Sequence, residues 1–158
     1  MEILSARIDE RLVHAQTTIN WIEYLKCDRV IVIDDNILAD DIQKNALKMS
    51  CPKNVKLSIL ESNNAASRFK EDFFENERVL ILFRGFKSLN RLISYGYMID
   101  KVYIGNLRYN EDDKIEINKN VSISPEQKEV ALNLIHEGVK LYLQLLPSHP
   151  CVELKDLL

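Results

Sequence analysis

Short apolar runs alternate with amphipathic segments along most of the chain. Each run ends in polar or turn-forming residues, and one of them, residues 30–33, is β-branched throughout. Continuous apolar runs of this length are typical of strands that are covered on both faces of a sheet. The predicted strands cover residues 3–8, 30–33, 55–60, 79–83, 101–104 and 139–146.

The segments between these runs show the 3.6-residue period of helices. The helix over residues 125–136 has the clearest start, because Ser124 is a helix-capping residue and Gln127 completes a capping box. The other predicted helices cover residues 17–25, 39–49, 65–74, 88–95 and 152–158, and the predicted buried stripe of 39–49 contains Ile42, Ala46, Leu47 and Met49.

This alternation of strands and helices predicts an α/β fold with a single open, mostly parallel sheet and helices on both faces. The exception is residues 115–123, where two short apolar segments flank a polar turn and predict a small antiparallel hairpin. No linker or repeat divides the chain, so we expect one domain over residues 1–158. Ligands of such sheets bind at the carboxyl ends of the strands, where the chemistry should be sought.

The composition excludes several classes of protein. Apolar residues make up 46% of the 158 residues, and 21 basic residues against 24 acidic ones leave a formal charge of −3. This balance argues against nucleic-acid binding, and no apolar run approaches the length of a membrane span. The N-terminus has no secretory signal pattern, and Cys27, Cys51 and Cys151 are too scattered for a disulfide framework or a zinc site. We therefore expect a cytoplasmic protein.

The loop after the first predicted strand carries the most concentrated chemistry. It contains Arg7, Asp9, Arg11, His14 and Gln16, and none of the residues that usually form a plain turn. Arginine pairs with phosphate oxygens, and a neutral imidazole beside the start of a helix is a good phosphoryl nucleophile in an anion-binding setting. The pattern indicates a phosphohistidine or a bound anion, and a surface ion network around a structural histidine remains the alternative.

Residues 7–16, RIDERLVHAQ, resemble the R-I-D-D/E-R-L-I/V-H-G-Q signature of one class of the bacterial sugar phosphotransferase system (PTS). The class is the IIB components of the mannose/fructose/sorbose family, and nine of the ten positions fit. Weaker matches follow along the whole chain, at Trp21, residues 32–35, residues 39–40, residues 82–83, Leu92, Gly96, residues 104–105 and residues 121–122.

The resemblance implies a function and a set of residue roles. His14 would accept a phosphoryl group through Nδ1 from a IIA partner and pass it to a sugar imported through membrane IIC and IID components. Arg11 and Arg7 would neutralise the phosphoryl oxygens, Asp9 would orient an arginine or the imidazole, and Gln16 would add a donor. This chemistry works by positioning and electrostatics, so we expect neither a metal nor a cofactor.

Three departures from the family pattern bear on the pocket. Ala15 replaces the glycine that follows the histidine, and Asn106 replaces the second glycine of a later turn, next to Gly105. A positive φ at Ala15 would cost roughly 1 kcal/mol, whereas asparagine tolerates the left-handed region better. Arg84 follows the fourth strand where the family usually has a proline nearby, and it either adds positive charge at the strand ends or is solvated.

Other residues are compatible with rival interpretations. Asp34 and Asp35 follow the second strand, so they do not match the acidic pair of receiver domains, which follows the first; we expect Asp35 to accept hydrogen bonds in the pocket and Asp34 to serve the turn. No glycine-rich nucleotide motif occurs, and the three histidines are too far apart for a metal cluster.

Two other function classes remain open on the sequence. One is a regulatory or binding module that kept the fold and lost transfer, which the changes at Ala15 and Asn106 would favour. The other is an unrelated α/β enzyme that uses a histidine on a free metabolite. A homodimer through exposed apolar helix faces is a further expectation.

Overall fold

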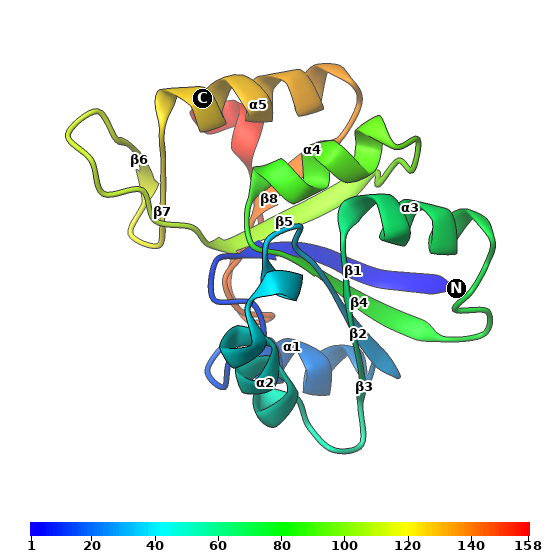
Figure 1. Cartoon of the computed structure of the whole chain (residues 1–158). Helices are drawn as coiled ribbons and strands as arrows, with labels where there is room; N and C mark the ends of the chain where they lie inside the picture. The colour runs from blue at the N-terminus through cyan, green and yellow to red at the C-terminus, as the bar shows by residue number, and fades with distance from the viewer.

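The central sheet has seven strands in the order β3-β2-β4-β1-β5-β8-β9, and the computed structural model describes all residues, 1–158 (Figure 1). All neighbouring pairs are parallel except β8 and β9, which are antiparallel. The strands are β1 (Glu2–Asp9), β2 (Arg29–Ile33), β3 (Lys56–Leu60), β4 (Arg78–Phe83), β5 (Lys101–Asn106), β8 (Lys140–Leu143) and β9 (Val152–Glu153).

Helices cover both faces of the sheet, so the predicted architecture is confirmed. In Figure 1, α1 and α2 lie on one face, and α3, α4 and α5 lie on the other. The helices are α1 (Thr18–Leu25), α2 (Asp41–Ser50), α3 (Ser62–Lys70), α4 (Phe86–Ser94) and α5 (Pro125–His136), with short 3₁₀ helices η1 (Ile37–Ala39) and η2 (Leu154–Leu157). None of the helices combines the length and apolar character needed to cross a membrane.

The side chains of the central strands alternate between two apolar cores. Along β2, Val30 and Val32 join the core under α1 and α2, while Ile31 and Ile33 join the larger core under α3, α4 and α5. Strand β4 alternates in the same way. The period of two in strands therefore accounts for the unbroken apolar runs, because each apolar residue of β2 and β4 is buried on one face or the other.

The predicted hairpin is present as β6 (Ile115–Asn118) and β7 (Val121–Ile123). It forms a separate two-stranded sheet, and a bridge between Leu107 and Val121 connects it to the chain that leaves β5. The Ser124 capping box of α5 is also present, with both of its hydrogen bonds.

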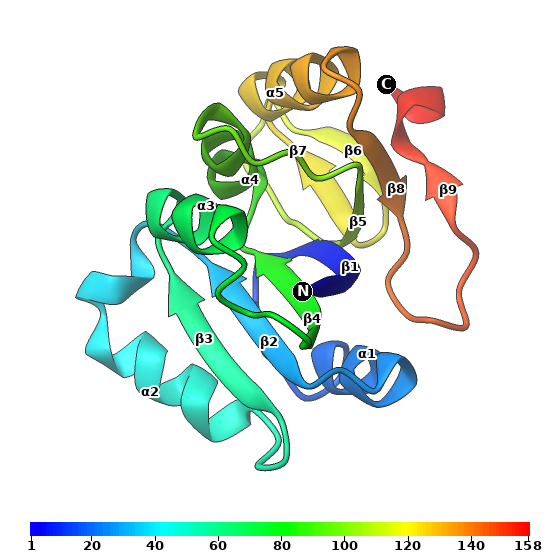
Figure 2. The same cartoon turned by 90° about the vertical axis from the view of Figure 1, so that its right-hand side faces the viewer.

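Several local predictions are wrong. The strand predicted over 139–146 ends at Leu143, and the helix predicted over 65–74 ends at Lys70. Residues 152–158 do not form one continuous helix, because Val152 and Glu153 extend the sheet beside β8 and only the short 3₁₀ helix η2 follows (Figure 2). The predicted buried stripe of α2 is reduced to Leu47, while Ile42 and Met49 are 83% and 87% exposed. Helix α2 covers the edge of the sheet near β3, which is only half-buried, so a single apolar residue reaches the core.

Strand β1 lies between β4 and β5, at the point where the strand order reverses. From β1 the chain goes to β2 and β3 on one side, and it returns through β4 before it continues to β5 and β8 on the other. Crevices outside the carboxyl end of such a strand are the usual ligand sites of open α/β sheets. The loop 10–17 leaves β1 at this point.

Candidate functional site

The loop that carries His14 begins with a tight turn at the end of β1. The backbone N–H of Leu12 donates to the carbonyl of Asp9 at 2.9 Å, and Leu12 has a φ of 56° although it is not glycine. Its side chain is 1% exposed and packs in the α1-side core together with Val13. Burial of these two side chains stabilises the strained turn, which leaves His14 half-buried at the surface.

The imidazole of His14 faces the start of α1. Its Nδ1 accepts a hydrogen bond from the backbone N–H of Gln16 at 3.2 Å, so this nitrogen carries a lone pair and the ring proton belongs on Nε2. The carbonyl of His14 accepts the N–H of Thr18 at 3.1 Å and begins the helix. No side chain caps α1, so its next amide groups, those of Ile19 and Asn20, remain without a side-chain partner near the ring.

Asp9 organises the loop from its buried position at the end of β1. One carboxylate oxygen accepts the backbone N–H of Arg11 at 3.0 Å and lies 3.5 Å from the Arg11 guanidinium. The other oxygen accepts the hydroxyl of Thr17 at 3.2 Å, which explains why Thr17 does not cap its own helix. The Arg11 side chain stays 38% exposed, so it has free donors on the solvent side of the loop.

Arg7 lies elsewhere, beneath the ring of Trp21. It is 3% exposed, its guanidinium carbon is 3.9 Å from the Trp21 ring centroid, and it donates to the carbonyls of Gln144 and Leu145. Trp21 donates to the same Leu145 carbonyl at 2.8 Å. Burial lowers the pKa of Arg7 to about 10, against the opposing effect of Asp9. The guanidinium that the sequence assigned to the phosphoryl oxygens is instead bound to the loop after β8.

Gly105 and Asn106 support this arrangement from β5. A Cβ on Gly105 would lie 3.0 Å from Nη2 of Arg7, so a side chain there would displace the arginine. Asn106 accepts the backbone N–H of Glu10 at 2.9 Å and donates its amide to the Glu10 carboxylate at 3.0 Å. Neither Asn106 nor Ala15 has a positive φ, so the two replaced glycines cause no backbone strain.

Arg84 anchors the other side of the loop. Its Nε donates to buried Asp34 at 2.7 Å, and its two terminal nitrogens donate to the Glu10 carbonyl at 3.0 Å and to the Gln43 side chain at 2.7 Å. One arginine thus joins the ends of β2 and β4 to the loop and to α2. The sequence pointed to Arg84 and Asp34 separately, and nothing in it indicated that they pair.

Asp35 points away from His14 toward the other face of the sheet. It accepts the backbone N–H and the hydroxyl of Ser62, at 2.7 and 2.9 Å, and the guanidinium of Arg91 at 3.1 Å. Burial raises the pKa of Asp35, but the hydrogen bonds from Ser62 and Arg91 outweigh it and the net pKa is lowered. Asp35 is therefore an acceptor, as expected, whose partners come from α3 and α4.

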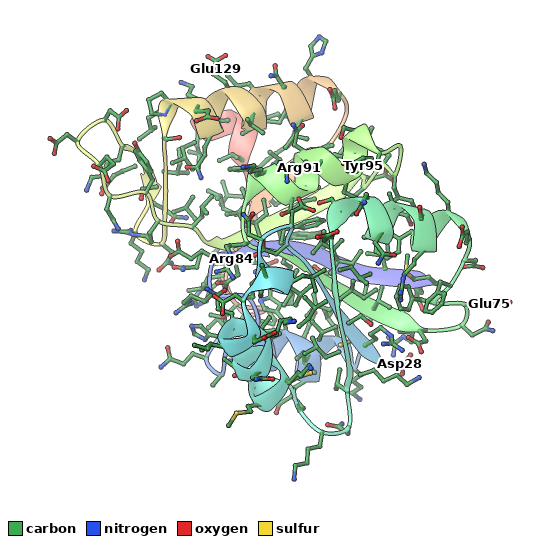
Figure 3. All side chains as sticks on the ribbon, in the orientation of Figure 1. Asp28, Glu75, Arg84, Arg91, Tyr95 and Glu129 are labelled. Carbon is green, nitrogen blue, oxygen red and sulfur yellow. The ribbon has the colours of Figure 1, made fainter.

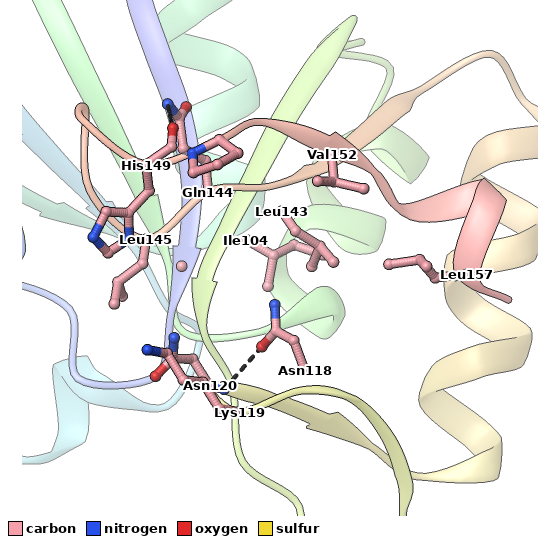
Figure 4. Close-up of a pocket in the computed structure, with 12 residues that line it drawn as sticks. Ile104, Asn118, Lys119, Asn120, Leu143, Gln144, Leu145, His149, Val152 and Leu157 are labelled. Carbon is pink, nitrogen blue, oxygen red and sulfur yellow. Dashed lines mark hydrogen bonds between the residues drawn. The ribbon is translucent and has the colours of Figure 1, made fainter.

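A cavity of about 610 Å³ opens beside Gly105, between the ends of β5 and β8 and the turn of the β6–β7 hairpin (Figure 4). His149 and the hairpin residues Asn118 and Lys119 lie on its rim, and Leu143 and Val152 line its apolar part. The His14 ring and Arg11 do not line this cavity. No three histidine, cysteine or carboxylate side chains come together as ligands for a metal.

These contacts define what the loop can do chemically. The His14 ring presents a nitrogen lone pair toward the Gln16 amide just before α1, and the half-exposed guanidinium of Arg11 lies on the same loop. An imidazole in this setting can take a phosphoryl group, whose oxygens would find donors already in place. Asp9, Thr17, Arg7 and Arg84 make hydrogen bonds to other groups of the protein and hold the loop in this conformation.

Comparisons with known proteins match the chain over nearly its full length. The family model of the "PTS system sorbose subfamily IIB component" matches residues 3–158. The fructose-specific EIIB component of Bacillus subtilis is 34% identical over 148 residues, which cover 94% of this chain and 90% of that protein. The sorbose-specific EIIB component of Lacticaseibacillus casei is 31% identical, over 95% of this chain and 91% of that protein.

Solved structures agree with the sequence matches. The crystal structure of the IIBSor domain of the sorbose permease from Klebsiella pneumoniae has a TM-score of 0.90 at 28% identity, over 99% of this chain and 95% of that one.

The mannose-specific EIIAB component of Escherichia coli is 27% identical over the whole of this chain, which spans 49% of that longer protein.

Proposed function

Since this chain belongs to the sorbose subfamily of PTS IIB components, we propose that His14 is the residue on which it carries a phosphoryl group. The chain is a phosphocarrier component of sugar uptake in the mannose/sorbose family. The single observation that carries the assignment to His14 is the hydrogen bond from the Gln16 amide to Nδ1, which leaves that nitrogen unprotonated and facing the start of α1.

Each half of the proposed transfer forms one bond and breaks one. The Nδ1 lone pair of His14 attacks the phosphorus of a phosphohistidine on a IIA phosphocarrier, and the electron pair of the broken P–N bond returns to the donor imidazole. The phosphoryl oxygens then replace Nδ1 as acceptors for the Gln16 amide, while Arg11 neutralises their charge. In the second half, a sugar hydroxyl attacks the phosphorus, loses its proton to solvent, and the N–P electron pair returns to His14.

The partners follow from this sequence of steps. The donor is a IIA domain or protein, and the acceptor is a sugar held by membrane IIC and IID components, so the chain works in the cytoplasm at the membrane surface. The match over residues 3–158 supports treating residues 1–158 as one IIB domain. The alternative of a module without transfer loses its motivation, because Ala15 and Asn106 adopt ordinary backbone conformations.

The proposal is tested by supplying the purified chain with radiolabelled phosphoenolpyruvate, the general PTS proteins and a IIA protein of the mannose family. We expect acid-labile label on the chain, which is discharged when membranes with IIC and IID and a sugar are added. His14→Ala should remain unlabelled, while the matched variants His136→Ala and His149→Ala should accept label as the wild type does. Undiminished label on His14→Ala would refute the assignment.

A further inference from the structure

A second cavity, of about 500 Å³, lies outside the carboxyl ends of β1, β2 and β4 and at the start of α4. It is separate from the cavity beside Gly105, and the His14 ring does not line it. Arg84 and Arg91, which line it, come from the end of β4 and from α4 (Figure 3). Arg11 reaches it from the His14 loop, so the cavity adjoins the phosphocarrier site.

The charges that line the cavity favour an anion. Its three carboxylates are already engaged: Glu10 accepts from Asn106 and Arg108, Asp34 from Asn36 and Arg84, and Asp35 from Ser62 and Arg91. Five cations line the same space, so its net formal charge is +2 in a chain whose total is −3. The five cations are Arg11, Arg84, Lys87, Arg91 and Arg108.

The first turn of α4 supplies donors that nothing in the protein uses. The helix begins after Gly85 without a side-chain cap and without an acidic residue in its first turn. Lys87 lines the cavity, and its ammonium makes no hydrogen bond or ion pair. Ser88 also lines the cavity and is 7% exposed, and its hydroxyl donates to no protein acceptor. An uncapped helix start beside a free lysine and a free hydroxyl is a setting for a phosphate group.

The rest of the cavity suits a polyhydroxylated group. The side-chain amides of Asn36 and Gln127 line it, and only one of its lining residues is apolar. The side-chain amides can exchange hydrogen bonds with hydroxyls, and the volume falls within the range of small-molecule sites.

We propose that this cavity binds a sugar phosphate, with its phosphate monoester on Lys87, Ser88 and the first amides of α4, and its hydroxyls toward Asn36 and Gln127. The phosphate chemistry is argued from the cavity alone, whereas the choice of a sugar as the esterified group rests on the proposed function. The site would hold the product of transfer next to the loop that released it.

Binding is measured by isothermal titration calorimetry on the full chain, with fructose 1-phosphate, glucose 6-phosphate, unphosphorylated fructose and inorganic phosphate as separate probes. We expect a sugar phosphate to bind the wild type and His14→Ala equally. Lys87→Ala and Ser88→Ala should each weaken that binding by about tenfold, since each removes a phosphate donor. Lys53→Ala, which removes an exposed lysine from the turn before β3, should bind as the wild type does.

Three outcomes would overturn the proposal. They are the absence of sugar phosphate binding to the wild type, equal affinity for inorganic phosphate and the sugar phosphates, and binding that Lys87→Ala and Ser88→Ala leave unchanged. The test is independent of the carrier role, because it uses no donor protein and includes His14→Ala. If His14 accepts no label but the chain still binds the sugar phosphate, the proposed function is wrong and the proposal for this site is retained.

Discussion

The substitution Arg7→Met tests whether Arg7 positions the loop or contacts the phosphoryl group. Methionine keeps much of the volume and removes the charge and the donors. Without Arg7, the carbonyls of Gln144 and Leu145 lose a buried donor, and Trp21 loses the cation above its ring. The loss of two buried hydrogen bonds to carbonyls and of one cation–π contact should lower the free energy of unfolding by about 5 kcal/mol.

Part of this loss is offset, because the folded protein no longer holds a buried charge. Burial lowers the pKa of Arg7 from its ordinary value to about 10. That difference corresponds to about 3 kcal/mol of destabilisation of the charged form in the folded chain. The net effect is a free energy of unfolding that is lower by about 2 kcal/mol, which is about 6 °C in Tm for a chain of this size.

The assay pairs urea denaturation with the rate at which His14 accepts a phosphoryl group. We expect Arg7→Met to show the loss of stability and a transfer rate within about tenfold of the wild type, below the denaturation range, because Arg7 acts through the loops that it joins. The reasoning would be refuted by wild-type stability combined with a rate as low as that of Arg11→Ala, since that result would place Arg7 on the phosphoryl group.

Arg11→Ala should leave the free energy of unfolding within about 0.5 kcal/mol of the wild type and slow phosphoryl acceptance about 100-fold in rapid-quench measurements, because it removes a transition-state donor from an exposed position. Thr17→Val should lower the free energy of unfolding by about 1 kcal/mol and slow transfer less than Arg11→Ala does, because it removes the hydroxyl that Asp9 accepts. Hydrogen bonds from Arg29 and Lys56 lower the pKa of Glu77 to about 2. The ionised Glu77 carboxylate therefore stabilises the fold fully above pH 4.5, and this stabilisation is lost as the pH falls toward 2. When the free energy of unfolding is measured over this pH range, Glu77→Gln should lose about 1–2 kcal/mol less than the wild type does.

Most of the fold followed from the sequence because most of its strands and helices have a clear local pattern. The β-branched run of β2 and the capping box of α5 determine their elements without help from distant residues. Helix α2 was harder, because its period indicates which side chains share a face and not how much of that face the sheet covers. Ile42 and Met49 fit the stripe and still lie in solvent, since the half-buried edge strand β3 offers them no partner.

The candidate site also has one part that the local sequence indicated and another part that it did not. Its reactive side chains, His14 and Arg11, lie within one short segment whose composition indicated their chemistry. The residues that hold this segment could not be assigned, because their partners are distant in the sequence. Arg7 is bound to a loop 137 and 138 residues away, and Arg84 joins residues 10, 34 and 43.

The positive φ of Leu12 could not be predicted from the sequence either. The sequence has no glycine or asparagine at that turn, and the left-handed conformation there depends on burial of the leucine side chain. Such a conformation is set by tertiary packing, for which the local pattern holds no signal.

We propose Nδ1 of His14 as the atom that carries the phosphoryl group, and long-range ¹H–¹⁵N NMR of the histidine rings tests this most directly. In the unphosphorylated chain, the spectrum should show Nδ1 of His14 without a proton. After phosphorylation by a IIA donor, we expect the phosphorus-coupled nitrogen to be Nδ1 of His14, with the rings of His136 and His149 unchanged. Phosphorus coupled to Nε2, or to either of the other histidines, would contradict the account.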